Sequence, residues 1–304
     1  MGHHHHHHHH MKFDNDSEKQ VFDKLKKAIP GIIKEKCAGY DELYGYKLNP
    51  EGLTQEEVDK YYDEKIADRL TYKLCKAYQF EYSTIVQNLI DILNWRREFN
   101  PLSCAYKEVH NTELQNVGIL TFDANGDANK KAVTWNLYGQ LVKKKELFQN
   151  VDKFVRYRIG LMEKGLSLLD FTSSDNNYMT QVHDYKGVSV WRMDSDIKNC
   201  SKTVIGIFQK YYPELLYAKY FVNVPTVFGW VYDLIKKFVD ETTRKKFVVL
   251  TDGSKLGQYL KDCPYEGYGG KDKKNNLTKQ NVTNVHPTEY GLYILQKQII
   301  EDVE

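Results

Sequence analysis

The last third of the chain changes its hydrophobic spacing from strand to helix and back to strand. Residues 215–224 form a β-rich run that stops at Pro225, because proline cannot donate to a sheet ladder. The next apolar positions recur at helical spacings of three and four: Val227, Val231, Leu234, Ile235 and Phe238. Residues 247–250 are a short continuous apolar run, which is typical of a buried strand. This order predicts a right-handed crossover helix between two parallel strands.

The amino-terminal third has helical spacing throughout. We predict an amphipathic helix over residues 14–36 that is broken near Pro30. A long helix is expected to start with the capping pattern at Thr54 and to run to about Tyr78. A further helix begins at Ser83. This third is therefore expected to form a helical subdomain.

The middle of the chain alternates between strand-like and helix-like patterns. Such alternation predicts an α/β sheet with helices packed on it. The predicted elements are strands at 114–122 and 132–138, a helix at 151–169, two strand-like segments within 178–193, a helix at 197–212, a polar loop at 271–284 and a terminal helix at 289–300.

Several short motifs follow one another in a fixed order. They are Trp95-Arg96-Arg97, Tyr212-Pro213-Glu214, Asn223-Val224-Pro225, Lys246 before an apolar strand, and Gly-Tyr-Gly-Gly at 267–270. Over residues 60–270 this ordered set resembles the CRAL-TRIO lipid-binding family. The resemblance implies a CRAL-TRIO α/β fold, with a helical amino-terminal subdomain and a mixed β-sheet that forms the floor of an apolar pocket. A gate helix, here at about 225–240, would close that pocket.

Composition sets the limits of this interpretation. Residues 1–10 are an expression tag, 11–110 the helical subdomain, 111–285 the ligand-binding domain and 286–304 a terminal helix. The net charge of +2 indicates no nucleic-acid partner. Five cysteines without a paired spacing favour reduced thiols in the cytoplasm. No apolar run suits a membrane span, so we expect only transient, peripheral membrane contact, for example at the endoplasmic reticulum.

The resemblance also suggests a headgroup site for phosphatidylinositol. Glu214, Thr243 and Lys246 occupy positions at which phosphoinositide-binding members hold the inositol phosphate. An ordinary surface ion pair between Glu214 and Lys246 is the competing interpretation. The basic residue expected before the Trp-Arg motif is replaced by Tyr78-Gln79, so we expect a weakened headgroup clamp. Phosphatidylinositol transfer between membranes is therefore the alternative function.

A second departure from the family pattern lies at Val182 to Gly187. Asp184, Lys186 and Gly187 match the family, but His183 and Tyr185 replace apolar residues. Alternate residues of a strand share a face, so His183 and Tyr185 should point the same way, about 7 Å apart. The resemblance implies that they point into the pocket. A buried polar group without a partner costs about 1–3 kcal/mol, and a lipid tail offers none.

Ferric haem b would offer such a partner, because its iron accepts a tyrosinate. The departures are similar to those of a fungal, haem-binding branch of the family. We therefore expect a non-enzymatic haem-binding protein in which Tyr185 ligates the iron and His183 supports it by a hydrogen bond. Arg158 would supply a cation that favours the phenolate. Tyr78 would reach the cavity from another side.

Other assignments remain open from the sequence. His183 could be the axial ligand, or His183 and Tyr185 could simply bond to each other in the core. Cys263, which precedes a proline, is a rival thiolate ligand. A peroxidase-like or catalase-like enzyme would need a distal acid–base group, whereas His110 and His286 lie in predicted loops.

Overall fold

A mixed five-stranded sheet is the centre of the structure, a computed structural model that describes residues 11–303 except 142, 189–194, 227, 228, 262 and 264. Its strands lie in sequence order, with the first pair antiparallel and the other pairs parallel. They are β3 (Gly118–Phe122), β4 (Ala132–Asn136), β5 (Met179–Asp184), β6 (Leu216–Val222) and β7 (Phe247–Leu250). The predicted α/β class and mixed sheet are confirmed, as is the parallel pairing of β6 with β7.

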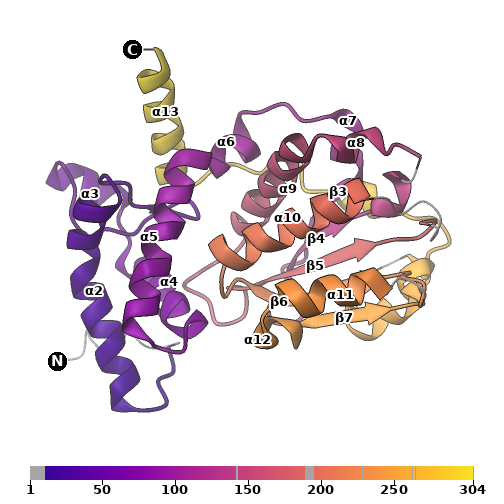
Figure 1. Cartoon of the computed structure of the whole chain (residues 1–304), viewed down its shortest axis with the longest axis horizontal. Helices are drawn as coiled ribbons and strands as arrows, with labels where there is room; N and C mark the ends of the chain where they lie inside the picture. The colour runs from indigo at the N-terminus through magenta and orange to yellow at the C-terminus, as the bar shows by residue number, and fades with distance from the viewer. Residues whose placement is uncertain are drawn as a thin grey trace.

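Both faces of the sheet are covered (Figure 1). Helices α9 (Val151–Leu166), α10 (Ser195–Tyr211) and α11 (Gly229–Phe238) cross one face, with α11 at the expected place of the gate helix. On the opposite face, Tyr268 in η4 (Glu266–Tyr268) packs against Trp135 at 5.3 Å between ring centroids. Val227 and Phe228 lie outside the described residues, as do the side chains of Trp230, Val231 and Leu234.

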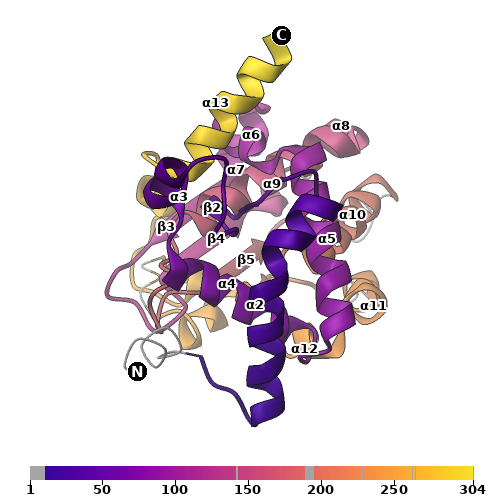
Figure 2. The same ribbon diagram turned by 90° about the vertical axis from the view of Figure 1, so that its left-hand side faces the viewer.

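The amino-terminal helices form a separate layer beside the sheet (Figure 2). This layer comprises α2 (Asp16–Lys36), the hairpin of β1 (Glu42–Leu43) and β2 (Tyr46–Lys47), α3 (Gln55–Tyr61), α4 (Glu64–Ala77), α5 (Tyr82–Phe99) and α6 (Pro101–Tyr106). The remaining elements are α7 (Thr112–Val117), η1 (Tyr138–Leu141), α8 (Glu146–Gln149), α12 (Glu241–Arg244), η3 (Gly253–Gln258), η5 (Leu277–Gln280) and α13 (Glu289–Val303). Among the described helices, none has the length and hydrophobicity that a bilayer span requires.

Four predicted elements or boundaries were wrong. The first helix is continuous through Pro30, because Ile29 and Ile33 are buried on the same face and hold both halves together. The predicted helix to Tyr78 is two helices, since Asp63 caps a new start by accepting from the backbone of Lys65. Residues 112–117 are helical before β3 begins, and η5 interrupts the predicted loop at 271–284.

A fully buried ion triad joins the helical layer to the sheet layer. Arg96 of α5 donates to Glu42 of β1 through Nε and Nη2, at 3.0 and 2.7 Å. It also donates to Glu163 of α9 through Nη1 and Nη2, at 3.2 and 2.7 Å. The side chains of all three residues are at most 1% exposed. The triad therefore fixes three separate elements through one guanidinium.

We expect Arg96→Leu to lower the free energy of unfolding by about 3–5 kcal/mol, because it leaves two carboxylates buried without a cation. Urea unfolding followed by circular dichroism measures this. The control is Arg97→Leu, which removes a side chain that is 39% exposed and should cost less than about 1 kcal/mol. Equal losses in the two variants would contradict a structural role for the triad.

Candidate functional site

A cavity of about 510 Å³ opens between the end of α4, helices α10 and α12, and strands β6 and β7. Four of the predicted site residues line it: Tyr78, Glu214, Thr243 and Lys246. The two alternative sets, one for haem and one for a lipid headgroup, therefore meet at one cavity. Its lining extends inward to Gln181 and Lys219. His183, Tyr185 and Arg158 do not line the cavity but lie next to this inner end, since Arg158 is 5.1 Å from the ring centroid of the lining residue Phe208.

The outer end of the cavity is organised around Glu214. Its carboxylate accepts from the hydroxyl of Tyr178 at 2.7 Å and pairs with Lys76 at 3.9 Å. Lys73, buried in α4, donates to the backbone carbonyl of Glu214 at 3.1 Å. The interpretation of a Glu214–Lys246 ion pair was wrong, since the cation within 4.0 Å is Lys76. Sequence comparison with the family pattern overlooked Lys76 because it lies half a turn before the expected position.

The register of the sheet determines which residues face the inner end. Gln181 of β5 lies beside Lys219 of β6, which lies beside Phe247 of β7. In the next row on the same face, His183 lies beside Phe221. Aligned neighbours in adjacent strands project to the same side, so this face presents a polar stripe among aromatic rings. It is the face that α9 and α10 cover (Figure 1).

His183 and Tyr185 share this face, as the alternation of the strand predicts. The two residues are 3% and 6% exposed. Tyr138 packs against both, at 5.3 Å from the ring of His183 and 5.8 Å from that of Tyr185. Phe221 packs against both as well, at 5.5 and 6.4 Å. Ile235 of α11 packs against the apolar cluster of Tyr185, Phe221 and Val224, so the expected gate helix borders the cluster that contains the predicted ligand.

Several polar groups at the inner end are buried without a hydrogen-bond partner among the described residues. Both ring nitrogens of His183 and all three guanidinium nitrogens of Arg158 are of this kind, as are both amide atoms of Asn136. The expected hydrogen bond from His183 to Tyr185 is absent from this structure, so it stays a prediction for a ligated state. Native proteins pair almost all such groups, which makes this cluster a candidate binding site.

Burial controls the protonation of these groups. It raises the pKa of Tyr185 above the ordinary value of a phenol, although the charge of Arg158 opposes this. Burial, with Lys219 and Arg158, holds the pKa of His183 well below its usual range. Both rings are therefore neutral at pH 7. At the outer end burial raises the pKa of Tyr78 to about 12.

The turn that presents Tyr185 is held by the neighbouring carboxylate. Asp184 accepts hydrogen bonds from the hydroxyl of Tyr268, from the Asn223 side chain at 2.9 Å and from the Lys186 backbone at 2.8 Å. Gly139 lies against the same turn, where a Cβ would be 1.8 Å from the carbonyl oxygen of Lys186. The turn thus has little freedom to move the Tyr185 ring.

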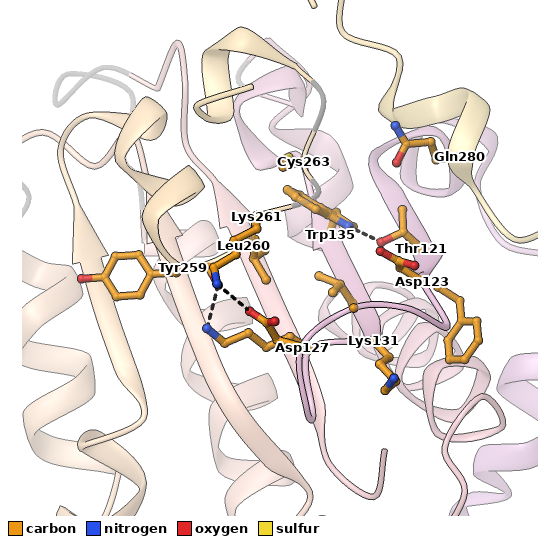
Figure 3. A pocket seen from close by; sticks show the side chains of 14 residues that line it. Thr121, Asp123, Asp127, Lys131, Trp135, Tyr259, Leu260, Lys261, Cys263 and Gln280 are labelled. Atoms are coloured by element: carbon orange, nitrogen blue, oxygen red, sulfur yellow. Dashed lines mark hydrogen bonds and ion pairs between the residues drawn. The ribbon is translucent and has the colours of Figure 1, made fainter. Parts of the chain in front are cut away.

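The rival ligands lie elsewhere. Cys263 lines a second cavity, of about 420 Å³, together with Trp135 (Figure 3). Trp135 alternates with Asn136 along β4, so this cavity is on the opposite face of the sheet from His183. Burial raises the pKa of the Cys263 thiol to about 12, which disfavours a thiolate. Thiolate ligation at the site of Tyr185 is therefore excluded by position, and Pro264 lies outside the described residues.

No bare metal site accompanies the cluster in the part of the chain that the structure describes. In that part, no three His, Cys, Asp or Glu side chains gather as they would around a metal ion. His110 instead bonds to the carbonyl of Cys104 at 2.6 Å.

Comparison with known proteins agrees with this geometry. Residues 116–270 match the model of the CRAL/TRIO domain, over half of the chain. The chain belongs to the CRAL/TRIO family. It is thus a CRAL-TRIO lipid-binding protein, as the resemblance in the sequence implied.

Named relatives extend the match over almost the whole chain. A phosphatidylinositol transfer protein SFH5 of Vanderwaltozyma polyspora is 63% identical over 97% of this chain and 100% of its own length. The protein of the same name from Candida glabrata is 64% identical over the same shares. A solved structure described as the crystal structure of Sfh5 is 98% identical, with a TM-score of 0.91 over 96% of this chain and 100% of that chain.

We expect Tyr268→Phe to lower the free energy of unfolding by about 1.5–3 kcal/mol, because it removes a buried hydrogen bond to the carboxylate of Asp184. Chemical denaturation measures the loss. Tyr265→Phe is the matched control on the same loop; no hydrogen bond of its hydroxyl is found among the described residues, so it should change stability by less than about 0.5 kcal/mol. If Tyr268→Phe leaves the free energy of unfolding unchanged, the hydrogen bonds of Asp184 do not hold the turn that presents Tyr185.

Proposed function

We propose that this protein binds ferric haem at the inner end of the cavity, with the Tyr185 phenolate as axial ligand and His183 and Arg158 in support. One observation carries the proposal: a neutral imidazole and a fully buried guanidinium, neither with a hydrogen-bond partner, lie beside Tyr185 on the cavity face of the sheet. The family's ordinary ligand has apolar tails there, and such tails satisfy none of these groups.

The chemistry of the side chains fits haem better than a bare cation. Bound haem would supply a ferric iron that already has four ring nitrogens and accepts a phenolate. The protein then needs to provide little more than Tyr185, in surroundings that are mostly aromatic. Tyr138, Phe221 and Phe247 form such surroundings on the same face. A flat apolar ligand is the kind that such rings accept.

The electrostatics determine what these residues do on binding. The Tyr185 phenol is neutral in the free protein, because burial keeps its pKa high. Ligation requires loss of that proton, and the charge of Arg158 stabilises the resulting phenolate. The nitrogens of His183 remain free to bond to the phenolate oxygen or to another ligand atom. Each residue thus has a distinct part in holding the iron.

The proposed role is to hold and exchange haem, in sensing or stress signalling, rather than to catalyse a reaction. An oxidative enzyme would need a second acid–base group opposite Tyr185. His110 is bonded to a backbone carbonyl away from β5, and His286 lies in the segment before α13. Neither histidine supports turnover at this site.

Phosphatidylinositol transfer is the second candidate, and the outer end of the cavity favours it. Lys246 and Thr243 line the cavity with Glu214, and Lys76 supplies a cation where the family pattern has lost one. Cations and a hydroxyl suit a phosphate, and the carboxylate suits inositol hydroxyls. The names of the relatives point the same way. The headgroup clamp is therefore more complete than the sequence led us to expect.

We expect Tyr185→Phe to abolish phenolate ligation while preserving the shape of the core. The purified variant should lose most of its haem and the charge-transfer band in its absorption spectrum. Tyr220→Phe, a buried tyrosine on the opposite face of β6, is the control and should keep both. Unchanged haem content and spectrum in Tyr185→Phe would rule this residue out.

His183→Ala separates support from ligation. If Tyr185 holds the iron, this variant keeps a phenolate signature in its resonance Raman spectrum but binds haem about tenfold or more weakly, as expected for a lost hydrogen bond to a charged group. Loss of the iron signal in His183→Ala, with retention in Tyr185→Phe, would invert the assignment.

For lipid transfer, Lys246→Ala and Lys76→Ala should each reduce the rate at which phosphatidylinositol moves between vesicles. Each change removes a cation from the outer end of the cavity, and we expect the affinity for the lipid phosphate to fall about tenfold. The exposed Lys237 of α11 is the control, and Lys237→Ala should transfer normally. If neither outer-end variant changes transfer, the headgroup set is not used in this way.

A further inference from the structure

Lys219 is a cation that no function discussed so far explains. It lies in the middle of β6, is 5% exposed, and lines the inner end of the cavity. Its ammonium is surrounded by three aromatic rings, at 5.9 Å from the centroid of Phe208, 5.5 Å from Phe221 and 5.4 Å from Phe247. Aromatic faces attract a cation, but they replace only part of its lost hydration.

A second buried cation lies next to Lys219. The guanidinium of Arg158 is 0% exposed and lies 5.1 Å from the centroid of the same Phe208 ring. Among the residues that the structure describes, neither cation has an Asp or Glu partner, and the polar side chain that interacts with the guanidinium of Arg158 is the neutral hydroxyl of Tyr138. Two buried like charges that share a ring repel each other, so this arrangement is costly without an anion.

We propose that Lys219 and Arg158 form a binding site for the carboxylate of an otherwise apolar ligand, at the inner end of the cavity. Burial, with the charge of Arg158, lowers the pKa of Lys219 to about 7, because both disfavour the charged ammonium. A bound anion would stabilise that charge. The rings of Phe208, Phe221 and Phe247 surround the ammonium, so the site suits an acid group attached to an apolar body. A phosphodiester headgroup instead matches the outer end, where Lys76, Thr243 and Lys246 line the cavity.

Two kinds of ligand could supply this carboxylate: a fatty acid, or a haem through its propionates. The fatty-acid source is independent of the proposed function, whereas the haem source rests on it. The shared chemistry is one carboxylate that accepts charge-assisted hydrogen bonds from an ammonium and a guanidinium. Esterification removes the charge with little change in shape, so it separates the acid group from the apolar body.

The experiment compares each acid with its ester. Oleate against methyl oleate is measured by calorimetry, and ferric haem against its dimethyl ester by absorbance titration. The variants are Lys219→Met, which keeps length but not charge, Lys219→Arg, which keeps charge, and the exposed control Lys237→Met. We expect the wild type and the control to prefer the acid by about ten- to a hundredfold, as for a hydrogen bond between charged groups. Lys219→Met should lose that preference, and Lys219→Arg should retain part of it.

Thermal unfolding of the ligand-free protein supplies an independent measurement. An unpaired buried ammonium destabilises the fold, so Lys219→Met should unfold at the same or a higher temperature than the wild type. A lysine held by a structural partner would give the opposite result. If Lys219→Met is more stable than the wild type but binds the acid more weakly, Lys219 serves a ligand rather than the fold.

The outcomes distinguish the two proposals. If the protein prefers oleate to methyl oleate but binds no haem, the carboxylate site is supported and the proposed haem function is wrong. Preference for haem over its ester, with no oleate binding, identifies the propionate as the source, and preference in both pairs shows a general acid site. If acid and ester bind equally in both pairs, or if Lys219→Met keeps the wild-type preference, the carboxylate site is overturned.

Discussion

The arrangement of the whole molecule depends on one buried guanidinium. Arg96 binds Glu42 of the β-hairpin and Glu163 of α9, so it joins the helical layer to the sheet layer. The adjacent Trp95 stacks on Tyr211 at the end of α10, with 4.4 Å between ring centroids. Two of the helices on the cavity face, α9 and α10, are thus contacted by neighbouring residues of α5. A shift of α5 would move the cavity roof with it.

Helix α9 connects this anchor to the site. Glu163 and Arg158 are five residues apart on it, and about 100° of rotation per residue separates them by about 140° around the helix axis. Glu163, which is paired with Arg96, therefore lies on one side of α9, and Arg158, which has no carboxylate partner, lies on another side. Arg96 has two carboxylates and full hydrogen bonding, whereas Arg158 has neither. Since burial of a lone cation lowers stability, Arg158 and Lys219 are retained at a cost to the fold. Ligand binding is the process that can offset this cost.

The sequence predicted the fold well because its signals are local. Strand alternation placed His183 and Tyr185 on one face, and helical spacing located α10 and α11. Lys219 was missed although its signal was present, since a lysine among the apolar residues of β6 shares the face of Phe221. The hydrogen-bonding state of His183 could not be predicted, because it depends on which residues α9 brings over β5. The opposite-face position of Cys263 likewise required the path of the chain after β7.

The two candidate ligands differ in what they demand of the same cavity. A phospholipid places its charge at the outer end, near Glu214 and Lys76, and needs an apolar inner end for its acyl tails. Here Lys219 lines the inner end and Arg158 and His183 lie next to it, so an acyl tail would leave these buried polar groups without an anion or a hydrogen-bond partner. Each would cost about 1–3 kcal/mol, and a charged group would cost more. A ligand with an apolar body and polar or metal centres avoids that cost. Under the proposed function, the polar groups near the inner end disfavour an acyl tail, whereas the outer end still suits a lipid headgroup.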